Sequence, residues 1–491
     1  MKYFFPIAIS LAFAFVIPAA PGERTNAPTP AAVEERVERV INGLLPATVF
    51  RNPHKFGPPA RLSDRMAYYQ TPGVSIAVVN NHEIEWARGF GVCEHRRRKT
   101  VTDATLFQAA SISKPVTALA VMRLVQDGKL DLDEDVNRYL TSWKVPSNGS
   151  WQPRITLRQI LSHSAGLTVH GFPGYTTREE IPSIPAILNG QPPANTPRIE
   201  VNLMPGVQPR YSGGGTTVAG QLLVDVLGKP FEQIMRELVL DPLELKHSTF
   251  AQPLPRRWSR QAATAHPAKW QPIEGKWHIY PELAPDGLWT TPSDLARIGI
   301  ELQQALQGKG KILSQSSAKA MLTPVVDEVG IGFMLDKRGE SVRFGHGGAN
   351  EGFLSQMTLY KEQGLGAIIM VNSGQGYSLI REIERAIARE YNWPDGFAED
   401  RKPLKLDQSD LEKYVGAYGT KPGFACNITR TNDQLFLCVD TQPPIELFAE
   451  SSTNFYMTVL DAEVSFDQTE GGITGITLLQ DDRKTSAERR R

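Results

Sequence analysis

Residues 106–128 have the sequence LFQAASISKPVTALAVMRLVQDG, and this stretch decides how the fold is interpreted. From Ser111 onward the apolar residues recur at helical spacing as far as Val125, and Gly128 stands where a helix would stop. Residues three apart share one face of a helix, so Lys114 is expected beside the Ser111 hydroxyl. The sequence therefore predicts a serine and a lysine together at the entrance of an apolar helix.

This pair is a candidate nucleophile with its proton partner. A serine hydroxyl needs a base within hydrogen-bond reach, and lysine can serve if burial lowers its pKa from about 10.4 to about 7.5, which costs roughly 4 kcal/mol. The alternative is a serine helix cap with a surface lysine. The same S-x-x-K spacing recurs at Ser316 and Lys319 within LSQSSAKAM, where the serines are interpreted as helix caps.

Two later segments favour the catalytic interpretation. In PRYSGGGTTVAG, Tyr211 and Ser212 precede three glycines, the first of which is Gly213, and the backbone can approach a ligand closely there before it enters a helix. In FGHGGANEGF, the triplet His346, Gly347 and Gly348 stands at the start of a strand.

In order and rough separation, the three segments resemble the three motifs of the serine β-lactamase-related hydrolases. That family includes class C β-lactamases, low-molecular-mass penicillin-binding proteins, D-aminopeptidases and related esterases. The phrases ITLRQILSHSAGL, YSGGGTTVAGQLL and DGLWTTPSDLAR support the resemblance, which covers roughly residues 35–395.

The resemblance implies a role for each matching residue. Ser111 would be the acylated nucleophile, Lys114 its proton partner, and Tyr211 the general base or proton shuttle facing the leaving group. His346 would orient that phenol or bind a substrate carboxylate. The backbone N–H groups of Ser111 and Ala349 would form the oxyanion hole. Ser212, Gly213, Gly347 and Gly348 would line the substrate site.

Two departures from the family pattern bear on the substrate. Gly213 stands where penicillin-recognising members usually have asparagine, which removes a side-chain amide. His346 replaces a lysine, which weakens the positive charge available to a carboxylate. Both changes favour a peptidase or esterase over a β-lactamase and leave the acylation machinery intact.

Strand hairpins at 73–92 and 354–373 bracket a helical middle of the chain. Thr156 precedes a predicted helical run, a threonine cap is predicted at the start of the helix TTPSDLARIGIELQQAL, and the proline-rich residues 170–210 are expected to be loop. The resemblance implies an α/β (α+β) fold over residues 32–400, in which an antiparallel sheet is flanked by helices and carries an inserted helical domain.

Beyond residue 400 the pattern changes to short, regularly spaced strand-like runs. They predict a C-terminal antiparallel β-barrel over residues 401–482, similar to the lipocalin-like barrels attached to some family members. The charged residues 483–491 are expected to be a disordered tail. Cys426 and Cys438 flank a predicted hairpin turn and are interpreted either as a cross-strand disulfide or as two free thiols.

Met1 and Lys2 precede an uncharged run that extends to residue 20. This predicts a signal peptide over residues 1–22, a linker over 23–31 and a secreted or periplasmic protein. An uncleaved membrane anchor is the alternative, because the run is close to the length of a membrane span.

The chain has 53 basic and 53 acidic residues, so no overall basic field favours nucleic acid as the main partner. Neither HExxH nor a close His/Cys cluster occurs, so neither a metal nor another cofactor is expected, and His163 is interpreted as structural. The oligomeric state stays open.

The predicted function is therefore that of an exported serine hydrolase, which forms a covalent acyl-enzyme with a peptide, D-amino-acid amide or ester carbonyl. The alternatives are a β-lactamase or penicillin-binding DD-peptidase, and a binding or sensor relative without turnover.

Overall fold

The computed structural model describes residues 28–45, 48–50, 60–338, 340–395, 399–401, 403–420, 424–439, 444–458, 462–480 and 483–490 of the 491-residue chain. The segment predicted as a signal peptide, residues 1–22, lies outside them. Within the described ranges, none of the helices has both the length and the apolar character that a bilayer span requires.

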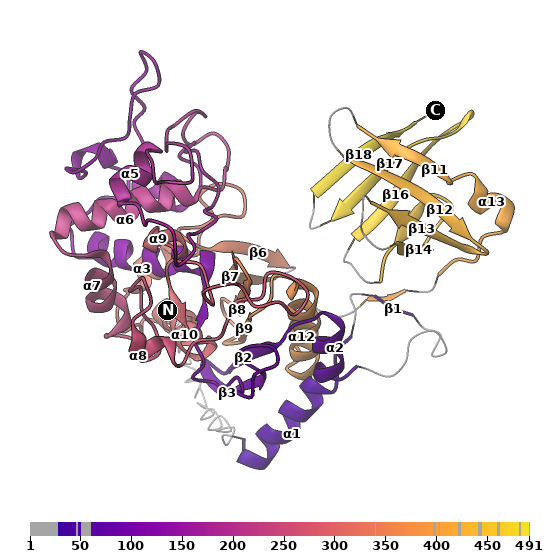
Figure 1. The fold of residues 1–491 in the computed structure, drawn as a ribbon, viewed down its shortest axis with the longest axis horizontal. Coiled ribbons are helices and arrows are strands. Elements are labelled where there is room, and N and C mark those ends of the chain that lie inside the picture. The colour runs from indigo at the N-terminus through magenta and orange to yellow at the C-terminus, as the bar shows by residue number, and fades with distance from the viewer. Residues whose placement is uncertain are drawn as a thin grey trace, which may run out of the picture.

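The core of the larger part is a six-stranded antiparallel sheet with the strand order β3-β2-β9-β8-β7-β6 (Figure 1). Strand β2 pairs with β9 from Val74 opposite Val371, so the first and last strands of this part meet in the middle of the sheet. The strands are β2 Gly73–Asn80, β3 Glu83–Gly91, β6 Met334–Arg338, β7 Ser341–Asn350, β8 Phe353–Tyr360 and β9 Gly366–Val371.

Strand β2 is buried on both faces because helices cover both sides of the sheet. Its side chains alternate as strand geometry requires: Val74 and Ile76 pack toward one core, whereas Ala77 and Val79 pack toward the other. The first core lies under α1 Pro30–Ile41, α2 Leu62–Tyr68 and α12 Tyr377–Glu390, and α10 Pro292–Leu306 crosses the opposite face.

Along the chain, the helical middle follows β3 and precedes β6 (Figure 1). Helix α3 Ser113–Gln126 is its buried centre, and the short turn η1 Ala110–Ile112 leads into it. The remaining elements are β4 Phe107–Gln108, α4 Leu157–Leu161, α5 Ile184–Asn189, α6 Gly213–Leu227, α7 Phe231–Met235, α8 Arg256–Ser259, α9 Leu283–Asp286, β5 Trp289–Thr290 and α11 Gln315–Met321.

The predicted threonine cap of α10 is confirmed, and the helical run predicted after Thr156 is α4. Thr156 forms a reciprocal capping box with Gln159 at the start of α4, and the Thr291 hydroxyl accepts a hydrogen bond from Asp294 at the start of α10. The predicted loop at 170–210 contains one short helix, α5. Ser314 caps α11, so the second S-x-x-K copy belongs to a capped surface helix as interpreted.

The C-terminal part is a closed eight-stranded barrel, as predicted (Figure 1). Tyr418, Leu437, Phe466 and Ile476 fill its interior. A short parallel pair, β1 Thr48–Phe50 and β10 Glu399–Arg401, precedes it together with α13 Gln408–Glu412. The barrel strands are β11 Gly416–Gly419, β12 Ala425–Thr431, β13 Gln434–Cys438, β14 Ile445–Ala449, β15 Asn454–Tyr456, β16 Ala462–Thr469, β17 Gly472–Gln480 and β18 Arg483–Arg489.

One expectation for this part was wrong, and of the two alternatives left open for the cysteines the structure agrees with free thiols. The residues expected to be a disordered tail, 483–491, include strand β18, which pairs with β17 and β11 and closes the barrel. Backbone hydrogen bonds to two neighbours hold this strand although Ala487 is its one residue in the barrel core. The disulfide alternative fails: Cys426 and Cys438 are free, and Cys438 pairs with Asn427, so the two thiols face opposite sides of the wall.

Strand β7 lies unusually close to the turn that carries Ser111. The Ser355 hydroxyl on β8 donates a hydrogen bond of 2.9 Å to the Ala109 carbonyl. A Cβ at Gly348 would lie 2.2 Å from that same carbonyl oxygen, which is far inside contact distance. A residue without a side chain is therefore required at this position.

We expect Gly348→Ala to lower the free energy of unfolding by about 2 kcal/mol or more, because the new methyl group meets backbone that cannot move away. Thermal unfolding followed by circular dichroism measures the effect. Gly347→Ala is the matched control, because the nearest atom to a Cβ there would be the Gln356 side-chain oxygen at a distance of 3.3 Å. Equal melting temperatures for the two variants would contradict the steric argument.

Candidate active site

Ser111 lies in the turn η1, immediately before α3. The residue before it, Ala110, is fully buried and has a positive φ of 50°, a conformation that costs free energy in a residue with a side chain. The Ala109 N–H donates to the Leu288 carbonyl, which ties this turn to the chain after α9. Ser111 therefore lies on a tight turn that a hydrogen bond from a distant segment of the chain holds in place.

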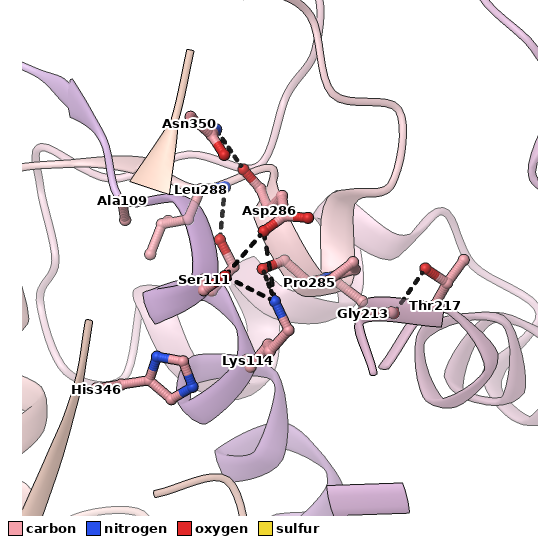
Figure 2. A network of polar contacts seen from close by, with 12 residues as sticks. Ala109, Ser111, Lys114, Gly213, Thr217, Pro285, Asp286, Leu288, His346 and Asn350 are labelled. Carbon is pink, nitrogen blue, oxygen red and sulfur yellow. Dashed lines mark hydrogen bonds and ion pairs between the residues drawn. The ribbon is translucent and has the colours of Figure 1, made fainter. Parts of the chain in front are cut away.

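The structure brings Ser111 and Lys114 together, as the spacing predicted (Figure 2). The Lys114 Nζ donates a hydrogen bond of 2.9 Å to the Ser111 Oγ, and the lysine is only 2% exposed. It also contacts the Pro285 carbonyl at 3.2 Å and the Asp286 Oδ1 at 3.4 Å. A buried ammonium is therefore surrounded by three oxygen acceptors.

Tyr211 packs between this lysine and three histidines. The Lys114 Nζ is 5.0 Å from the centre of the phenol ring, within the range of a cation–π contact. The ring centres of His163, His170 and His346 lie 4.3, 4.8 and 5.9 Å from it. The phenol and the amine predicted to act together are neighbours in the structure.

Ser111, Tyr211 and His346 open into one cavity of about 550 Å³. Gly347, Gly348 and Ala349 line it from β7, and Asp286 lines it beside Ser111. The rest of the lining is His170, Gly171, Phe172, Met334, Leu354, Ser355, Gln356, Tyr377 and Ile380.

Ser212 and Gly213 lie behind this cavity and do not line it. The Ser212 hydroxyl caps α6 by accepting from the Gly215 N–H at 2.9 Å, and it donates to the Thr168 carbonyl. The Gly213 N–H donates to the His170 carbonyl. These hydrogen bonds hold the loop that carries Tyr211, and the expected substrate contacts of Ser212 and Gly213 stay predictions.

The charge of Lys114 differs from the sequence expectation. Burial lowers the pKa of Lys114, but the Asp286 carboxylate and the Tyr211 phenol outweigh it, so the pKa of this lysine is raised above its ordinary value. Lys114 is therefore an ammonium ion at neutral pH. A lowered pKa was the condition for Lys114 to act as a base, and the contact with Asp286, which local spacing does not predict, shifts the pKa in the opposite direction.

Asp286 is the main functional residue that sequence reasoning missed. It is the last residue of the four-residue helix α9 and the first residue of the phrase DGLWTTPSDLAR. That phrase had served only as support for the family resemblance. Four hydrogen bonds hold this segment in place. They join Thr117 to the Ala284 carbonyl, Lys114 to the Pro285 carbonyl, Asn350 to the Asp286 carbonyl, and the Leu288 N–H to Ser113.

His346 is an uncharged imidazole. Burial and the charge of Lys114 lower the pKa of His346 to about 4, despite the opposing effect of the Gly347 carbonyl. The Nδ1 lies 2.6 Å from that carbonyl and must carry the proton to bond with it, which leaves Nε2 as an acceptor. Within the described residues, Nε2 has no hydrogen-bond partner.

His163 also stays neutral, because burial, Lys114 and two nearby histidines hold the pKa of His163 well below its ordinary value. Its Nδ1 accepts the Ser212 N–H at 3.2 Å while its ring packs on Tyr211. The residue interpreted as structural thus packs directly against the Tyr211 phenol.

Glu282 is a second buried acid near the site. Its side chain is fully buried, and within the described residues neither carboxyl oxygen has a hydrogen-bond partner. Burial, together with the charge of Asp286, raises the pKa of Glu282 to about 8. The group is therefore protonated at neutral pH, one turn before the carboxylate that contacts Lys114.

We expect the free energy of unfolding to fall as the pH rises from about 4.5 to 8, because the unfolded chain loses the Glu282 proton first while the folded chain retains it. The loss is on the order of 4 kcal/mol. Glu282→Gln should remove this part of the pH dependence, measured as the melting temperature between pH 6.5 and 8.5. Exposed Glu35→Gln is the control, and an unchanged slope in Glu282→Gln would contradict the assignment.

The sequence model of the family described as Beta-lactamase matches residues 60–391. A second model, a domain of unknown function (DUF3471), matches residues 400–489 and so covers the barrel.

Two curated relatives are similar to this chain. Penicillin-binding protein 4* of Bacillus subtilis (strain 168) is 22% identical over 448 residues, which cover 84% of this chain and 94% of that protein. Protein flp of Staphylococcus aureus (strain MW2) is 26% identical over 324 residues, which cover 62% of this chain and 60% of that protein.

Solved structures show the same fold. The octameric penicillin-binding protein homologue from Pyrococcus abyssi has a TM-score of 0.60 at 20% identity, covering 87% of this chain and 98% of that one. The D-amino acid amidase from Ochrobactrum anthropi SV3, in complex with L-phenylalanine amide, has a TM-score of 0.53 at 23% identity, covering 67% and 96%.

Proposed function

This chain belongs to the Beta-lactamase family, whose members include serine hydrolases, and we propose that it is an exported serine hydrolase acting through an acyl-enzyme on Ser111. The contact that carries the proposal is the 2.9 Å hydrogen bond from a buried lysine to a serine hydroxyl that opens into a cavity. Export rests on the uncharged run that follows Lys2.

In this mechanism Ser111 Oγ attacks the substrate carbonyl carbon, and the leaving group departs with a proton from Tyr211. The backbone N–H groups of Ser111 and Ala349 would stabilise the developing oxyanion, since Ala349 lines the cavity from β7. Water then releases the acyl group by the same steps in reverse. The Tyr211 phenol suits this role because it packs beside the Lys114 ammonium, which can restore its proton.

We assign the substrate first to peptides or D-amino-acid amides, then to esters, and last to β-lactams. Neither arginine nor lysine occurs among the described residues that line the cavity, and His346 is uncharged, so a substrate carboxylate finds no cation there. Phe172, Met334 and Leu354 provide an apolar wall for a hydrophobic substituent. The D-amino acid amidase with the same fold agrees with this order.

One substrate panel separates the candidates. It consists of a D-amino-acid amide, a D-Ala-D-Ala peptide, a p-nitrophenyl ester and nitrocefin, measured by turnover and by intact mass. Preferred turnover of the amide supports the proposal, and preferred turnover of nitrocefin contradicts the substrate order. Preferred turnover of the D-Ala-D-Ala peptide, which carries a free carboxylate, would identify the alternative of a penicillin-binding DD-peptidase. An adduct that persists with every compound would identify the alternative, a binding protein without turnover.

We expect Ser111→Ala to lose covalent labelling by a fluorophosphonate probe and to slow ester hydrolysis at least about a thousandfold, because the nucleophile is removed. Labelling is followed by intact mass. Ser316→Ala in the second S-x-x-K copy is the matched control and should label like the wild type. Labelling retained in Ser111→Ala would place the nucleophile elsewhere.

We expect Tyr211→Phe to lower kcat about a hundredfold or more with little change in KM, because the ring stays in place and only the phenolic proton is lost. Steady-state hydrolysis of an amide with a poor leaving group measures the effect. The control is Tyr68→Phe at a tyrosine that is 64% exposed on α2. A rate near that of the control would exclude Tyr211 from proton transfer.

A further inference from the structure

The Ser111 hydroxyl contacts two charged groups at once (Figure 2). It accepts a hydrogen bond from the Lys114 Nζ at 2.9 Å and donates one to the Asp286 Oδ1 at 3.3 Å. A serine hydroxyl has a single proton, so the direction of that second bond identifies the group toward which the proton points. That group is the carboxylate.

Lys114 is unsuited to receive this proton. A charged lysine has three N–H donors and no acceptor. The oxygens of Ser111, Pro285 and Asp286 lie within 3.4 Å of its Nζ, and the Tyr211 phenol is a further hydrogen-bond partner. Each donor thus has an acceptor, and no lone pair faces the serine. The raised pKa of Lys114, which the nearby carboxylate and phenol produce against burial, agrees with this hydrogen-bond pattern.

We propose that Asp286 is a catalytic residue that takes the proton of Ser111 as the acyl-enzyme forms, while Lys114 remains an ammonium that stabilises the serine oxygen. This inference rests on the proposed function, because it assumes that Ser111 is acylated. It assigns the base to a residue that lies 175 positions after the serine in the chain.

The proposed step balances. The Ser111 O–H bond breaks and its proton moves to the Asp286 Oδ1, while the serine oxygen bonds to the carbonyl carbon and the carbonyl π electrons move onto oxygen. When that intermediate collapses, the bond to the leaving group breaks and the leaving group takes the phenolic proton of Tyr211. Lys114 restores the proton to Tyr211, and Asp286 restores the proton to Lys114.

The surroundings of Asp286 suit a group that must hold one geometry. The hydrogen bonds from Thr117, Lys114 and Asn350 fix the backbone carbonyls of residues 284–286, so the segment that carries the carboxylate is held against the start of α3. The Asp286 carboxylate is paired with the Lys114 ammonium, and only 5% of the Asp286 side chain and 3% of the Lys114 side chain are exposed. Asp286 and Lys114 thus form an ion pair in a site that excludes most water.

The first test uses Asp286→Asn, which keeps the size of the side chain but cannot accept a proton at neutral pH. We expect the acylation rate, measured as the pre-steady-state burst with a p-nitrophenyl ester, to fall about 10² to 10⁴-fold with KM almost unchanged. Asp225→Asn is the matched control, since Asp225 lies near the far end of α6 and accepts hydrogen bonds from Ser142. A wild-type burst in Asp286→Asn would overturn the proposal.

The second test separates a chemical role from a structural one. In Asp286→Ala, added formate should restore acylation in a concentration-dependent manner, because the small carboxylate can occupy the vacated space, whereas chloride at the same ionic strength should not. If Asp286→Asn does not fold, the rescue of Asp286→Ala by formate decides whether Asp286 acts as the base. A folded Asp286→Ala that is slow and insensitive to formate would make Asp286 a positioning residue and overturn the proposal.

These experiments also distinguish a failure of the inference from a failure of the proposed function. If Ser111→Ala still labels with a fluorophosphonate, the proposed acyl-enzyme is wrong, whatever Asp286 does. If labelling requires Ser111 but Asp286→Asn acylates normally, only the assignment of the base is wrong.

Discussion

A single buried ammonium group constrains the centre of this protein. Lys114 lies in the first turn of α3 with almost no exposure, where an unpaired charge would cost several kcal/mol. The fold meets this cost by bringing residues 284–286 against that turn, which supplies a carbonyl and a carboxylate to the amine. The same contacts place the Asp286 carboxylate beside the Ser111 hydroxyl. The segment that stabilises the buried lysine is therefore also the segment that contacts the serine.

The sheet imposes the second constraint, because the cavity is formed where β7 passes the turn before α3. Gly348 permits the close approach, and the hydrogen bond from Ser355 to the Ala109 carbonyl fixes it. Ala110 keeps its left-handed conformation within this contact. Strain at the residue before the nucleophile is thus balanced by packing between a strand and a turn that are more than 200 residues apart in sequence.

The sequence predicted those features that depend on local spacing. Residues three apart placed Lys114 beside Ser111, a threonine cap marked the start of α10, and regular short strands indicated the barrel. Asp286 could not be found this way, because an isolated acid on a four-residue helix has no periodic signal and its partner lies 172 positions away. The sign of the lysine pKa shift depended on that missed contact.

The errors in the barrel have a similar origin. The charged composition of the last residues indicated a disordered tail. The strand β18 forms there because it is held mainly by backbone hydrogen bonds to both neighbouring strands, which composition does not reveal. The cysteines were judged by their distance from a turn, but the true register offsets Cys426 and Cys438 by one residue. In a strand, an offset of one residue turns a side chain to the opposite face, so approximate symmetry about a turn cannot predict a disulfide.

The charge pattern around Tyr211 limits which substrates this site can favour. His163 and His346 stay neutral because they are buried beside the Lys114 charge, so the phenol is surrounded by dipoles, and the nearest cation is already paired with Asp286. A substrate carboxylate near His346 would meet no free positive charge and would lie in the same cavity as an existing carboxylate. A neutral or cationic substrate avoids this repulsion, and the unpartnered Nε2 of His346 can accept a hydrogen bond from an N–H group. The neutral His346 therefore gives this part of the cavity a hydrogen-bond acceptor, which supports the substrate order proposed above.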